Sequence, residues 1–459
     1  MADYDVVVLG SGPGGYVAAI RAGQLGMRTA VVERGEVGGV CLNWGCIPSK
    51  ALLRNAEVLS LFRHADTFGI HVEGLTHDFG KAIDRSRDVV HRLTRGVAFL
   101  LKKNGVEYVA GNGGLRDKNT VAVDGGRSLT TENIIIATGA RFRSLPSLPV
   151  DGNVVITSRE ALELREVPGR VVIVGAGATG AEFAYLWRAY GSEVTLVELL
   201  PRLVPLEDED VSKELERSFR RQGISAMTGS MVEGVELVGD GARVTVSRGQ
   251  EQTVIDCDKV LVAVGMQGNI DGIGLDEVGV ETDRGSIPVD GAMQTNVSGV
   301  YAIGDVTGKS LLAHVASAQG VTAIESIAGL EPPVLDYELM SRATYCRPQI
   351  ASFGLTEAQA RERGYTVKIG KFPLSASGKA LALAEPEGMV KVVVDAEIGD
   401  ILGAHMIGAE VTELLGELGM AKLLESTNRE LGWLVHPHPT ISESLKEAAL
   451  VTSGEAIHV

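Results

Sequence analysis

Short aliphatic runs alternate with helical stretches over the first part of the chain. Residues 5–9 read Asp-Val-Val-Val-Leu, and an uninterrupted run of this kind predicts a strand buried on both faces of a parallel sheet. A helical stretch follows from Tyr16 to about Leu25, and residues 29–32 predict a second strand. Strands that alternate with helices in this way favour an α/β fold.

A glycine-rich turn joins the first strand to the helix. Gly10, Gly12 and Gly15 form the pattern GxGxxG, with Gly14 between them, and Glu33 ends the second strand. The first glycine allows a tight turn, the second lets the backbone approach a pyrophosphate, and the third lets helix and strand pack closely. A carboxylate at Glu33 would accept hydrogen bonds from ribose hydroxyls. Strand, turn, helix and acid together predict a dinucleotide-binding unit.

The same unit recurs later in the chain. Residues 171–174 predict a strand, Gly175, Gly177 and Gly180 repeat the glycine pattern, and Glu198 repeats the acid. The first glycine and the acid are 23 positions apart in both copies, since 33 − 10 equals 198 − 175. We therefore expect one chain to hold two nucleotides. The alternative is that one copy is a structural duplicate that binds nothing.

Two of the four cysteines, Cys41 and Cys46, lie in a glycine-rich loop just after the first unit. A zinc site would need a second ligand pair with metal spacing, which the sequence lacks. A structural disulfide is the alternative to a redox-active thiol pair, although it fits poorly in a reducing compartment. Bridged cysteines need Cα atoms within about 6.8 Å, while a helix advances about 7.5 Å over five residues. The segment is therefore expected to be irregular at Cys41 and helical only after Cys46, where a helix N-terminus would stabilise a thiolate. Cys257 and Cys346 are expected to be small buried residues.

Composition excludes several classes of protein. A net charge of −16 and a pI near 5.1 argue against a nucleic-acid partner. The sequence contains no run of about 18 uncharged apolar residues, so we expect no membrane span. We also expect no signal peptide, because the first predicted strand begins too early to leave room for one. We expect a cytoplasmic protein in a reducing compartment, with one catalytic disulfide as the exception.

These motifs resemble the class I pyridine nucleotide-disulfide oxidoreductases. Residues 301–305 (Tyr-Ala-Ile-Gly-Asp) are similar to the second flavin motif of that family, and residues 345–357 to the opening of its dimerisation domain. Residues 436–443 (His-Pro-His-Pro-Thr-Ile-Ser-Glu) are similar to its C-terminal catalytic box. The resemblance runs the whole length of the chain. It implies two Rossmann-like dinucleotide-binding domains, for FAD and NAD, and a C-terminal α+β dimerisation domain.

The expected domain boundaries follow from the motifs and from two proline-rich stretches. A chain of 459 residues is too long for a single core. We expect a FAD-binding domain with the redox disulfide at 1–150, whose helical middle runs from about 54 to 103. An NAD-binding domain is expected at 151–266, a central segment returning to the FAD domain at 267–336, and an interface domain at 337–459.

By resemblance, Cys41 would exchange with a substrate thiol and Cys46 would be the charge-transfer thiolate against the flavin. Lys50 would lie near the flavin N5 and pair with Glu182 near the nicotinamide. Without the resemblance, Lys50 and Glu182 would be interpreted as surface charges. No metal is expected. The family's remaining cofactor contacts correspond to Gly113, Thr138, Gly139, Gly265, Gly304, Asp305 and Ala313, with Asp305 meeting the ribityl chain.

A dithiol substrate needs a base, because only a thiolate attacks a disulfide, and imidazole titrates in the right range. His438 fits this role, and Glu443 would fix its tautomer and stabilise the imidazolium. His436 competes for this role, but it is interpreted as a packing or capping histidine, and the spacing of five residues to Glu443 favours His438. By resemblance, the box reaches the cysteines of the other subunit, which implies a homodimer. The bond between His438 and Pro439 is expected to be cis on the same basis.

The resemblance implies oxidation of dihydrolipoamide to lipoamide with reduction of NAD, as the shared dehydrogenase component of 2-oxo acid dehydrogenase complexes. Family members that use glutathione carry arginines for a 2′-phosphate, whereas Leu199 and Leu200 follow Glu198 here, which favours NAD. Members that reduce mercury have extra C-terminal cysteines, which are absent from residues 454–459. From another class, a flavin-bearing binding or signalling protein without thiol chemistry is the alternative.

The C-terminal segment is acidic. Residues 401–459 contain eight glutamates and three lysines or arginines, a net charge of −5. The ordinary interpretation is a solvated acidic face. By resemblance, this region docks a small basic domain of the lipoyl-bearing acyltransferase subunit near the dimer axis, and we expect that binding to be sensitive to salt.

Overall fold

The computed structural model describes residues 2–143 and 145–459, which divide into two compact units. The first unit is made of the ranges Met1–Ala51, Ile83–Arg143 and Gly265–Tyr337. The second is made of Leu52–Ala82, Ser144–Val264 and Glu338–Val459. Each unit is therefore assembled from segments that are distant in the sequence.

The first unit is built on a mostly parallel sheet with strand order β3-β2-β1-β6-β5-β4, and β17 pairs with β6. Only β4 and β5 run antiparallel to their neighbours. Val6, Val7 and Val8 are fully buried between two apolar clusters, which confirms the predicted strand covered on both faces. The strands are β1 (Tyr4–Leu9), β2 (Thr29–Glu33), β3 (Glu107–Ala110), β4 (Gly113–Asp117), β5 (Thr120–Val123), β6 (Arg127–Ile136) and β17 (Val300–Ala302).

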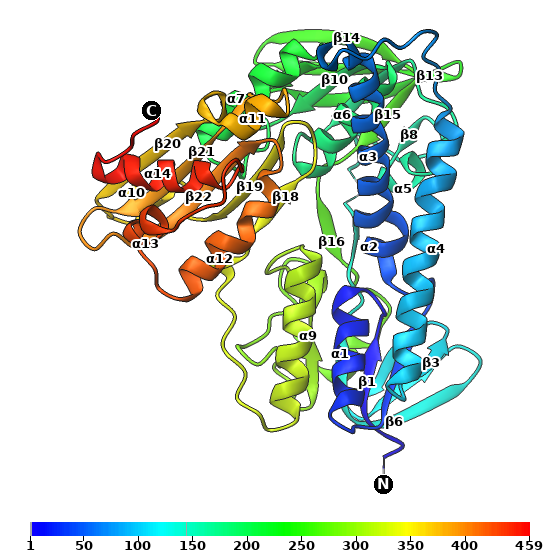
Figure 1. Ribbon diagram of the computed structural model, residues 1–459. Coiled ribbons are helices and arrows are strands. Elements are labelled where there is room, and N and C mark those ends of the chain that lie inside the picture. Colours follow the sequence, from blue (N-terminus) through cyan, green and yellow to red (C-terminus); the bar gives the residue numbers. More distant parts are fainter. Residues whose placement is uncertain (1, 144) are drawn as a thin grey trace. The chain divides into compact units, whose positions relative to one another are not determined.

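Two helices of this unit, α1 (Pro13–Gln24) and α9 (Ala313–Ile327), lie side by side (Figure 1). Small residues make this approach possible. A Cβ on Gly14 would lie 3.0 Å from the carbonyl oxygen of Ala316, and a Cβ on Gly320 would lie 2.7 Å from that of Gly14. Arg21 of α1 adds a charge-assisted hydrogen bond to Glu325 of α9. A helix from the third segment is thus fixed to the helix that follows the first glycine turn.

The predicted helical middle is interrupted. Helix α3 (Cys46–Arg63) is followed by a short 3-10 turn, η1 (Ala65–Phe68), and helix α4 (Phe79–Lys103) begins only after residues 70–78. Gly69 and Gly74 lie at this break, and glycine is a poor helix former. The prediction of helix through residues 64–78 was therefore wrong.

In the second unit, a parallel sheet with strand order β11-β10-β9-β15-β8 repeats the dinucleotide-binding topology. Its strands are β8 (Val155–Ile156), β9 (Arg170–Val174), β10 (Glu193–Glu198), β11 (Ser225–Thr228) and β15 (Lys259–Val262). The helices here are α5 (Ser158–Ala161), α6 (Ala178–Tyr190) and α7 (Glu209–Arg221). An antiparallel sheet of β12 (Met231–Val238), β13 (Gly241–Arg248) and β14 (Glu251–Cys257) adds a second layer.

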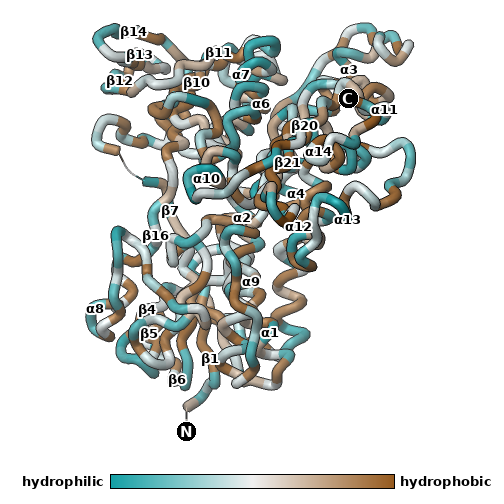
Figure 2. The backbone as a smooth tube through the Cα atoms, turned by 90° about the vertical axis from the view of Figure 1, so that its left-hand side faces the viewer, coloured by the Kyte–Doolittle hydropathy of each residue, from teal (hydrophilic) through white to brown (hydrophobic). Residues whose placement is uncertain are grey.

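The second unit also holds an antiparallel sheet with strand order β18-β19-β22-β21-β20. Residues alternate along β21: Val390, Val392 and Val394 pack with Leu445 and Ala448 of helix α14. Figure 2 shows β21 as largely hydrophobic and α7 as largely hydrophilic. The strands are β18 (Arg342–Thr344), β19 (Gln349–Gly354), β20 (Val367–Pro373), β21 (Gly388–Asp395) and β22 (Ile401–Gly408).

Shorter elements complete the two units. The first contains strands β7 (Ala140–Phe142) and β16 (Met266–Gly268), helices α2 (Gly39–Trp44) and α8 (Leu275–Val278), and 3-10 turn η2 (Gly304–Thr307). The second contains α10 (Glu357–Glu362), α11 (Gly378–Ala382), α12 (Leu415–Leu423), α13 (Asn428–Trp433) and α14 (Glu443–Ser453). Within the described parts of the chain, no helix combines the length and apolar character needed to cross a bilayer.

Candidate active site

The first glycine turn has the geometry that a dinucleotide loop requires. Gly10 has φ +101°, and a Cβ there would overlap the carbonyl oxygen of Ala137 at the end of β6. A Cβ on Gly15 would overlap the carbonyl oxygen of Gly10, so the start of α1 lies directly on the turn. A Cβ on Gly12, by contrast, would meet no atom within 4 Å. The open side of the turn is therefore at Gly12, where a pyrophosphate can reach the helix N-terminus.

The second turn repeats these relations. Gly175 has φ +98°, a Cβ on Gly180 would overlap the oxygen of Gly175, and Gly177 is open. The two copies share even this pattern of close and open positions, so the second retains the shape of a nucleotide site. The alternative of a degenerate duplicate finds no support in the backbone geometry.

The two acids are held in the same way. Glu33 accepts hydrogen bonds from the backbone N–H groups of Ser11 and Gly35, each at 2.8 Å. Glu198 accepts from the N–H groups of Ala176 at 2.7 Å and Leu200 at 2.9 Å. Each carboxylate is thus fixed against its glycine turn, and its remaining lone pairs can accept from ribose hydroxyls.

The redox segment is bonded directly to the first glycine turn. The N–H of Gly38 donates to the carbonyl oxygen of Ser11 at 3.0 Å, and a Cβ on Gly39 would lie 2.7 Å from the Cα of Gly12. Tyr16, in the helix after the turn, has its pKa raised by burial and by the neighbouring Cys41 thiol. The cysteine segment therefore lies directly beside the open side of the glycine turn.

Cys41 and Cys46 are half-buried thiols in this structure, and their side chains are hydrogen-bonded to each other. The hydrogen bond to Cys46 and burial raise the pKa of Cys41, while the ammonium of Lys50 lowers it. Cys46 is the first residue of the 18-residue helix α3, where the helix dipole stabilises negative charge.

The expected irregular backbone at Cys41 is not what the structure shows. Cys41 lies inside helix α2, and the break falls at Gly45, with φ −140° and ψ −115°. Two short helical pieces that change direction at Gly45 bring the two thiols together as effectively as an irregular strand. The expected break in the backbone is therefore present, but it lies at Gly45, four residues after the expected position.

Asp305 lies in the 3-10 turn η2, which follows β17. Burial raises the pKa of Asp305 to about 6, because the charged carboxylate is poorly solvated there. A polar group of a bound cofactor would replace the missing water. Nothing in the sequence singled out Gln319, which is fully buried in α9 and accepts a hydrogen bond from the N–H of Gly304 at 2.6 Å. Its amide donates to the hydroxyl of Tyr337 at 2.8 Å. Gln319 thereby fixes the loop that carries Asp305.

The other expected cofactor residues are found in the same unit. Thr138 donates to the carbonyl oxygen of Asn269 at 2.8 Å, and Asn269 returns a hydrogen bond to Thr138 at 2.9 Å. Gly113 is a packing position, since a Cβ there would lie 2.8 Å from Leu9. Of the remaining expected residues, Ala313 begins α9, while Gly139 and Gly265 lie in turns with positive φ.

His438 and Glu443 form a hydrogen-bonded pair in the second unit. The Nδ1 atom of His438 lies 2.9 Å from Oε1 of Glu443, while the other oxygen accepts from the N–H of Thr440 at 2.8 Å. Among other contributions, this backbone hydrogen bond and the imidazole keep the pKa of Glu443 below its usual value, against the effect of burial. The imidazole is 79% exposed, so Nε2 is accessible. The bond between His438 and Pro439 is cis, as expected.

The side chains of His436 and Glu182 are both buried. His436 has a side chain only 3% exposed and bonded to Glu417 of α12 at 2.8 Å, which agrees with a packing role. Glu182 is 6% exposed in α6 and accepts from the N–H of Tyr345 at 2.9 Å. The bottom-up interpretation of Glu182 as a surface charge was wrong.

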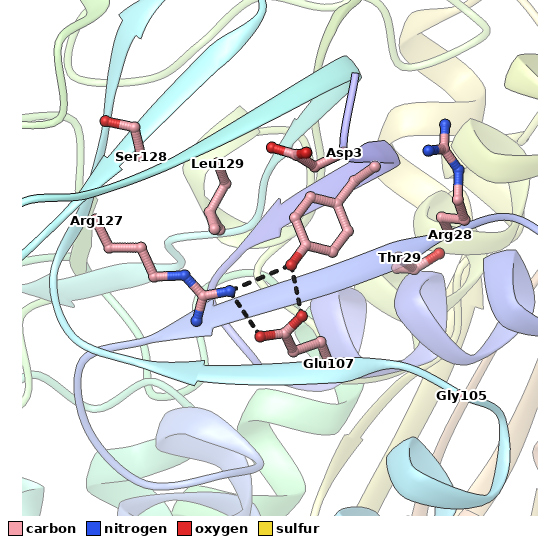
Figure 3. Close-up of a pocket in the computed structure, with 9 residues that line it drawn as sticks. Asp3, Arg28, Thr29, Gly105, Glu107, Arg127, Ser128 and Leu129 are labelled. Atoms are coloured by element: carbon pink, nitrogen blue, oxygen red, sulfur yellow. Dashed lines mark hydrogen bonds and ion pairs between the residues drawn. The ribbon is translucent and has the colours of Figure 1, made fainter. Parts of the chain in front are cut away.

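A hollow of about 600 Å³ lies elsewhere in the first unit, among Asp3, Arg28, Thr29, Glu107 and Arg127. Figure 3 shows Arg127 and Glu107 pointing toward one another there, and they are 2.7 Å apart. Thr29 and Glu107 begin their strands, whereas ligands of parallel sheets bind at the carboxyl ends. Because its arginines are already paired with acids, we assign this hollow no role in the chemistry.

Two nucleotide folds and a thiol pair on one glycine turn define a flavin- and nicotinamide-dependent disulfide oxidoreductase. The profile of the family described as pyridine nucleotide-disulphide oxidoreductase matches residues 4–320, and that of its dimerisation domain matches residues 340–449. The chain belongs to this family, and its cofactors are FAD and NAD.

Relatives of known name agree. A protein of Mycobacterium leprae named dihydrolipoyl dehydrogenase is 51% identical over 97% of both chains. One of the same name from Bacillus subtilis is 45% identical over 99% of both. The crystal structure of LpdA from Mycobacterium tuberculosis superposes with a TM-score of 0.90 at 27% identity, covering 97% of this chain and 99% of that one. The fold class expected from the sequence is thereby confirmed.

Proposed function

We propose that this protein oxidises dihydrolipoamide to lipoamide and reduces NAD, as its relatives' name indicates. The observation that carries the proposal is the bonding of the cysteine segment to the first glycine turn through Gly38 and Ser11. That contact would place a redox-active Cys41–Cys46 pair beside FAD. Residues 1–150 and 267–336 would serve FAD, 151–266 NAD, and 337–459 the dimer contact.

The thiol chemistry assigned to the residues balances as follows. One substrate thiol gives its proton to His438 and attacks the sulfur of Cys41, which breaks the disulfide and leaves Cys46 as a thiolate. The second substrate thiol attacks the mixed disulfide and its proton passes to the departing Cys41 sulfur, so lipoamide leaves and Cys41 is returned as a thiol. The substrate has then lost two electrons and two protons. FAD, when bound, would pass the two electrons of the thiol pair to NAD as a hydride.

Residues of this chain prepare both steps. The dipole of α3 and the ammonium of Lys50 favour a thiolate, and Glu443 would orient the His438 ring and stabilise it when protonated. Gly10, Gly12, Gly15 and Glu33 would hold FAD, with Asp305 at the ribityl chain. Gly175, Gly177, Gly180 and Glu198 would hold NAD, with Glu182 near the nicotinamide.

The direct test is NAD reduction by dihydrolipoamide, compared with reduction of glutathione disulfide by NADPH. We expect the first reaction to be at least 100-fold faster in kcat/KM. A faster glutathione reaction would contradict the proposal. Absence of a red-shifted charge-transfer band on two-electron reduction would instead favour a flavoprotein without thiol chemistry.

The proposal includes a homodimer whose sites join two chains. The dimerisation-domain match supports it, as does the apolar surface at Leu423, Trp433 and Val435, which are 70%, 70% and 85% exposed in the single chain. Cys46→Ser and His438→Gln homodimers should both fail to oxidise dihydrolipoamide. Remixed heterodimers should recover up to about half the wild-type activity, since one of two composite sites is intact. Verified heterodimers without activity would place both groups in one chain.

We further propose a cytoplasmic location and docking to the lipoyl-bearing acyltransferase of a 2-oxo acid dehydrogenase complex. The acidic charge of residues 401–459 supports docking to a basic domain. Binding to an isolated peripheral-subunit-binding domain should weaken at least tenfold between low and high salt. Unchanged affinity would remove the electrostatic part of this proposal.

A further inference from the structure

An arginine of helix α4 is bound to the loop between the two cysteines. The guanidinium of Arg87 donates to the backbone carbonyl of Asn43 at 2.8 Å. The same guanidinium lies 5.2 Å from the ring centroid of Trp44, within the range of a cation–π contact. Asn43 and Trp44 are the last two residues of helix α2. Arg87 therefore caps the C-terminal end of the helix that carries Cys41.

The segment between the cysteines is also held by hydrogen bonds from its own side chains. The amide of Asn43, which is 5% exposed, donates to the carbonyl oxygens of Val37 at 3.0 Å and Gly39 at 2.9 Å. The indole N–H of Trp44 donates to Glu36 at 3.4 Å. Asn43 thus fixes the start of α2, while Arg87 fixes its end. Of the two contacts, only the one from Arg87 brings a permanent positive charge.

The segment that holds this charge is close in sequence to the reacting sulfurs. Asn43, whose carbonyl binds Arg87, is three residues from Cys46, so the Cα atoms of Asn43 and Cys46 are separated by roughly 11 Å at most. A fixed cation bound to this segment favours a thiolate over a neutral thiol or a disulfide. The C-terminal carbonyls of α2 would oppose that effect if they were left uncapped.

We propose that Arg87, held on Trp44, is a positioning residue of the redox pair: it fixes the loop between the cysteines and shifts the disulfide–dithiol equilibrium toward the reduced, thiolate-bearing form. This rests on the proposed roles of Cys41 and Cys46. Reduction adds two electrons and one proton to the disulfide, giving a Cys41 thiol and a Cys46 thiolate, with a dithiol as the reductant. The cation stabilises the product of that step and not the disulfide.

The test compares Arg87→Gln, Arg87→Lys and Trp44→Leu in the FAD-loaded protein. The disulfide–dithiol equilibrium is measured in dithiothreitol redox buffers, and the charge-transfer absorbance is titrated with pH after two-electron reduction. Arg87→Gln should shift the equilibrium about tenfold toward the disulfide, which is about 30 mV for a two-electron couple. The charge-transfer absorbance should appear at a pH about one unit higher. Arg87→Lys keeps the charge and should recover most of both effects, while Trp44→Leu should give an intermediate shift.

Arg85→Gln is the matched control. Arg85 lies on the same helix and donates to the carbonyl of Ala51 at 3.0 Å, outside the loop between the cysteines. It should leave both readouts unchanged. Electron transfer from NADH to ferricyanide, which bypasses the thiols, should stay within about twofold in every variant. If Arg87→Gln shows the wild-type equilibrium and titration, the inference is overturned. If Arg87→Gln does not fold, a wild-type equilibrium and titration for Trp44→Leu overturn it instead.

The control reactions separate this inference from the proposed function. If the wild-type protein shows no charge-transfer band and no oxidation of dihydrolipoamide, the proposed function fails, and the inference with it. If the wild-type protein shows both and the Arg87 variants match it, only the role of Arg87 is refuted.

Discussion

Removing the ammonium of Lys391 should destabilise the second unit far more than removing an exposed charge from the same cluster. Five polar residues lie directly opposite one another across the β18-β19-β22-β21-β20 sheet: Arg342, Ser352, His405, Lys391 and Lys371. Lys391 is 2% exposed, and its Nζ lies 2.8 Å from Asp208, 2.6 Å from Asp210 and 2.9 Å from Glu357. The first two acids belong to the start of α7, so this ammonium joins the β18-β19-β22-β21-β20 sheet to the nucleotide-binding fold.

The magnitude follows from what Lys391→Met leaves behind. Burial alone would raise the pKa of Asp208, but Lys391 and the other polar partners hold it below its usual value. Breaking a buried ion pair by removing one partner costs about 3–5 kcal/mol, because a carboxylate is left buried without its counter-charge. Lys371→Met is the matched control. Lys371 also binds Asp210, at 2.6 Å, but is 46% exposed, so its loss should cost less than about 1 kcal/mol.

Urea unfolding of the FAD-loaded protein, followed by circular dichroism, measures both free energies. The difference between wild type and Lys391→Met should shrink as the pH falls from 7 toward about 4. The depressed pKa of Asp208 means that its stabilisation is present above the unfolded value and lost as the pH falls, whereas an orphaned carboxylate is relieved when it takes up a proton. Equal losses for the two lysine variants, or a difference that is independent of pH, would refute the reasoning.

Three further outcomes are expected. Gly12→Ala should fold normally but lose FAD affinity at least tenfold, because its Cβ meets only the space assigned to the cofactor. Gly15→Ala should fail to fold stably, because its Cβ would overlap the carbonyl oxygen of Gly10. Flavin content and circular dichroism distinguish the two variants. Glu198→Gln should reduce kcat/KM for NAD about 10- to 100-fold by weakening the ribose contacts, and should narrow the preference over NADP; equal values for the two coenzymes in the wild type would contradict this. Flavin-free protein should lose up to about 2–3 kcal/mol of stability as the pH rises from 4 to 6, because the folded carboxyl of Asp305, with its pKa raised to about 6, keeps a proton that the unfolded chain releases; Asp305→Asn should abolish that slope in urea midpoints.

The parts of the fold that depend on local patterns could be predicted from the sequence. The two glycine turns are specified by residues within one turn, helix and following strand, so the sequence pattern alone determines the geometry of each turn. Even the paired hydrogen bonds of Glu33 and Glu198 to their glycine turns follow from the equal spacing. The buried strand at residues 5–9 was also predictable, since an aliphatic run has no polar face to expose.

What could not be predicted depends on contacts between distant segments. Gln319 is a polar residue in an otherwise ordinary helical sequence, and only its approach to Gly304 gives it a role. Glu182 is buried because the backbone of Tyr345, 163 residues away, caps its carboxylate. The row of polar residues that contains Lys391 depends on how five strands are aligned with one another. The hydrophobic pattern does not determine that alignment for a charged residue inside an aliphatic run.

The redox loop shows how these two kinds of information combine. Gly38 and Gly39 are fixed by the glycine turn, because any side chain at Gly39 would push α2 away from Gly12. Trp44, which lies between the cysteines, instead contacts Arg87 of α4. A change at the glycines must therefore disturb FAD and the thiols together. A change at Trp44 or Arg87 can alter the disulfide–dithiol equilibrium while the cofactor site stays intact. The contact between these two residues is therefore where that equilibrium can be changed independently of the flavin site.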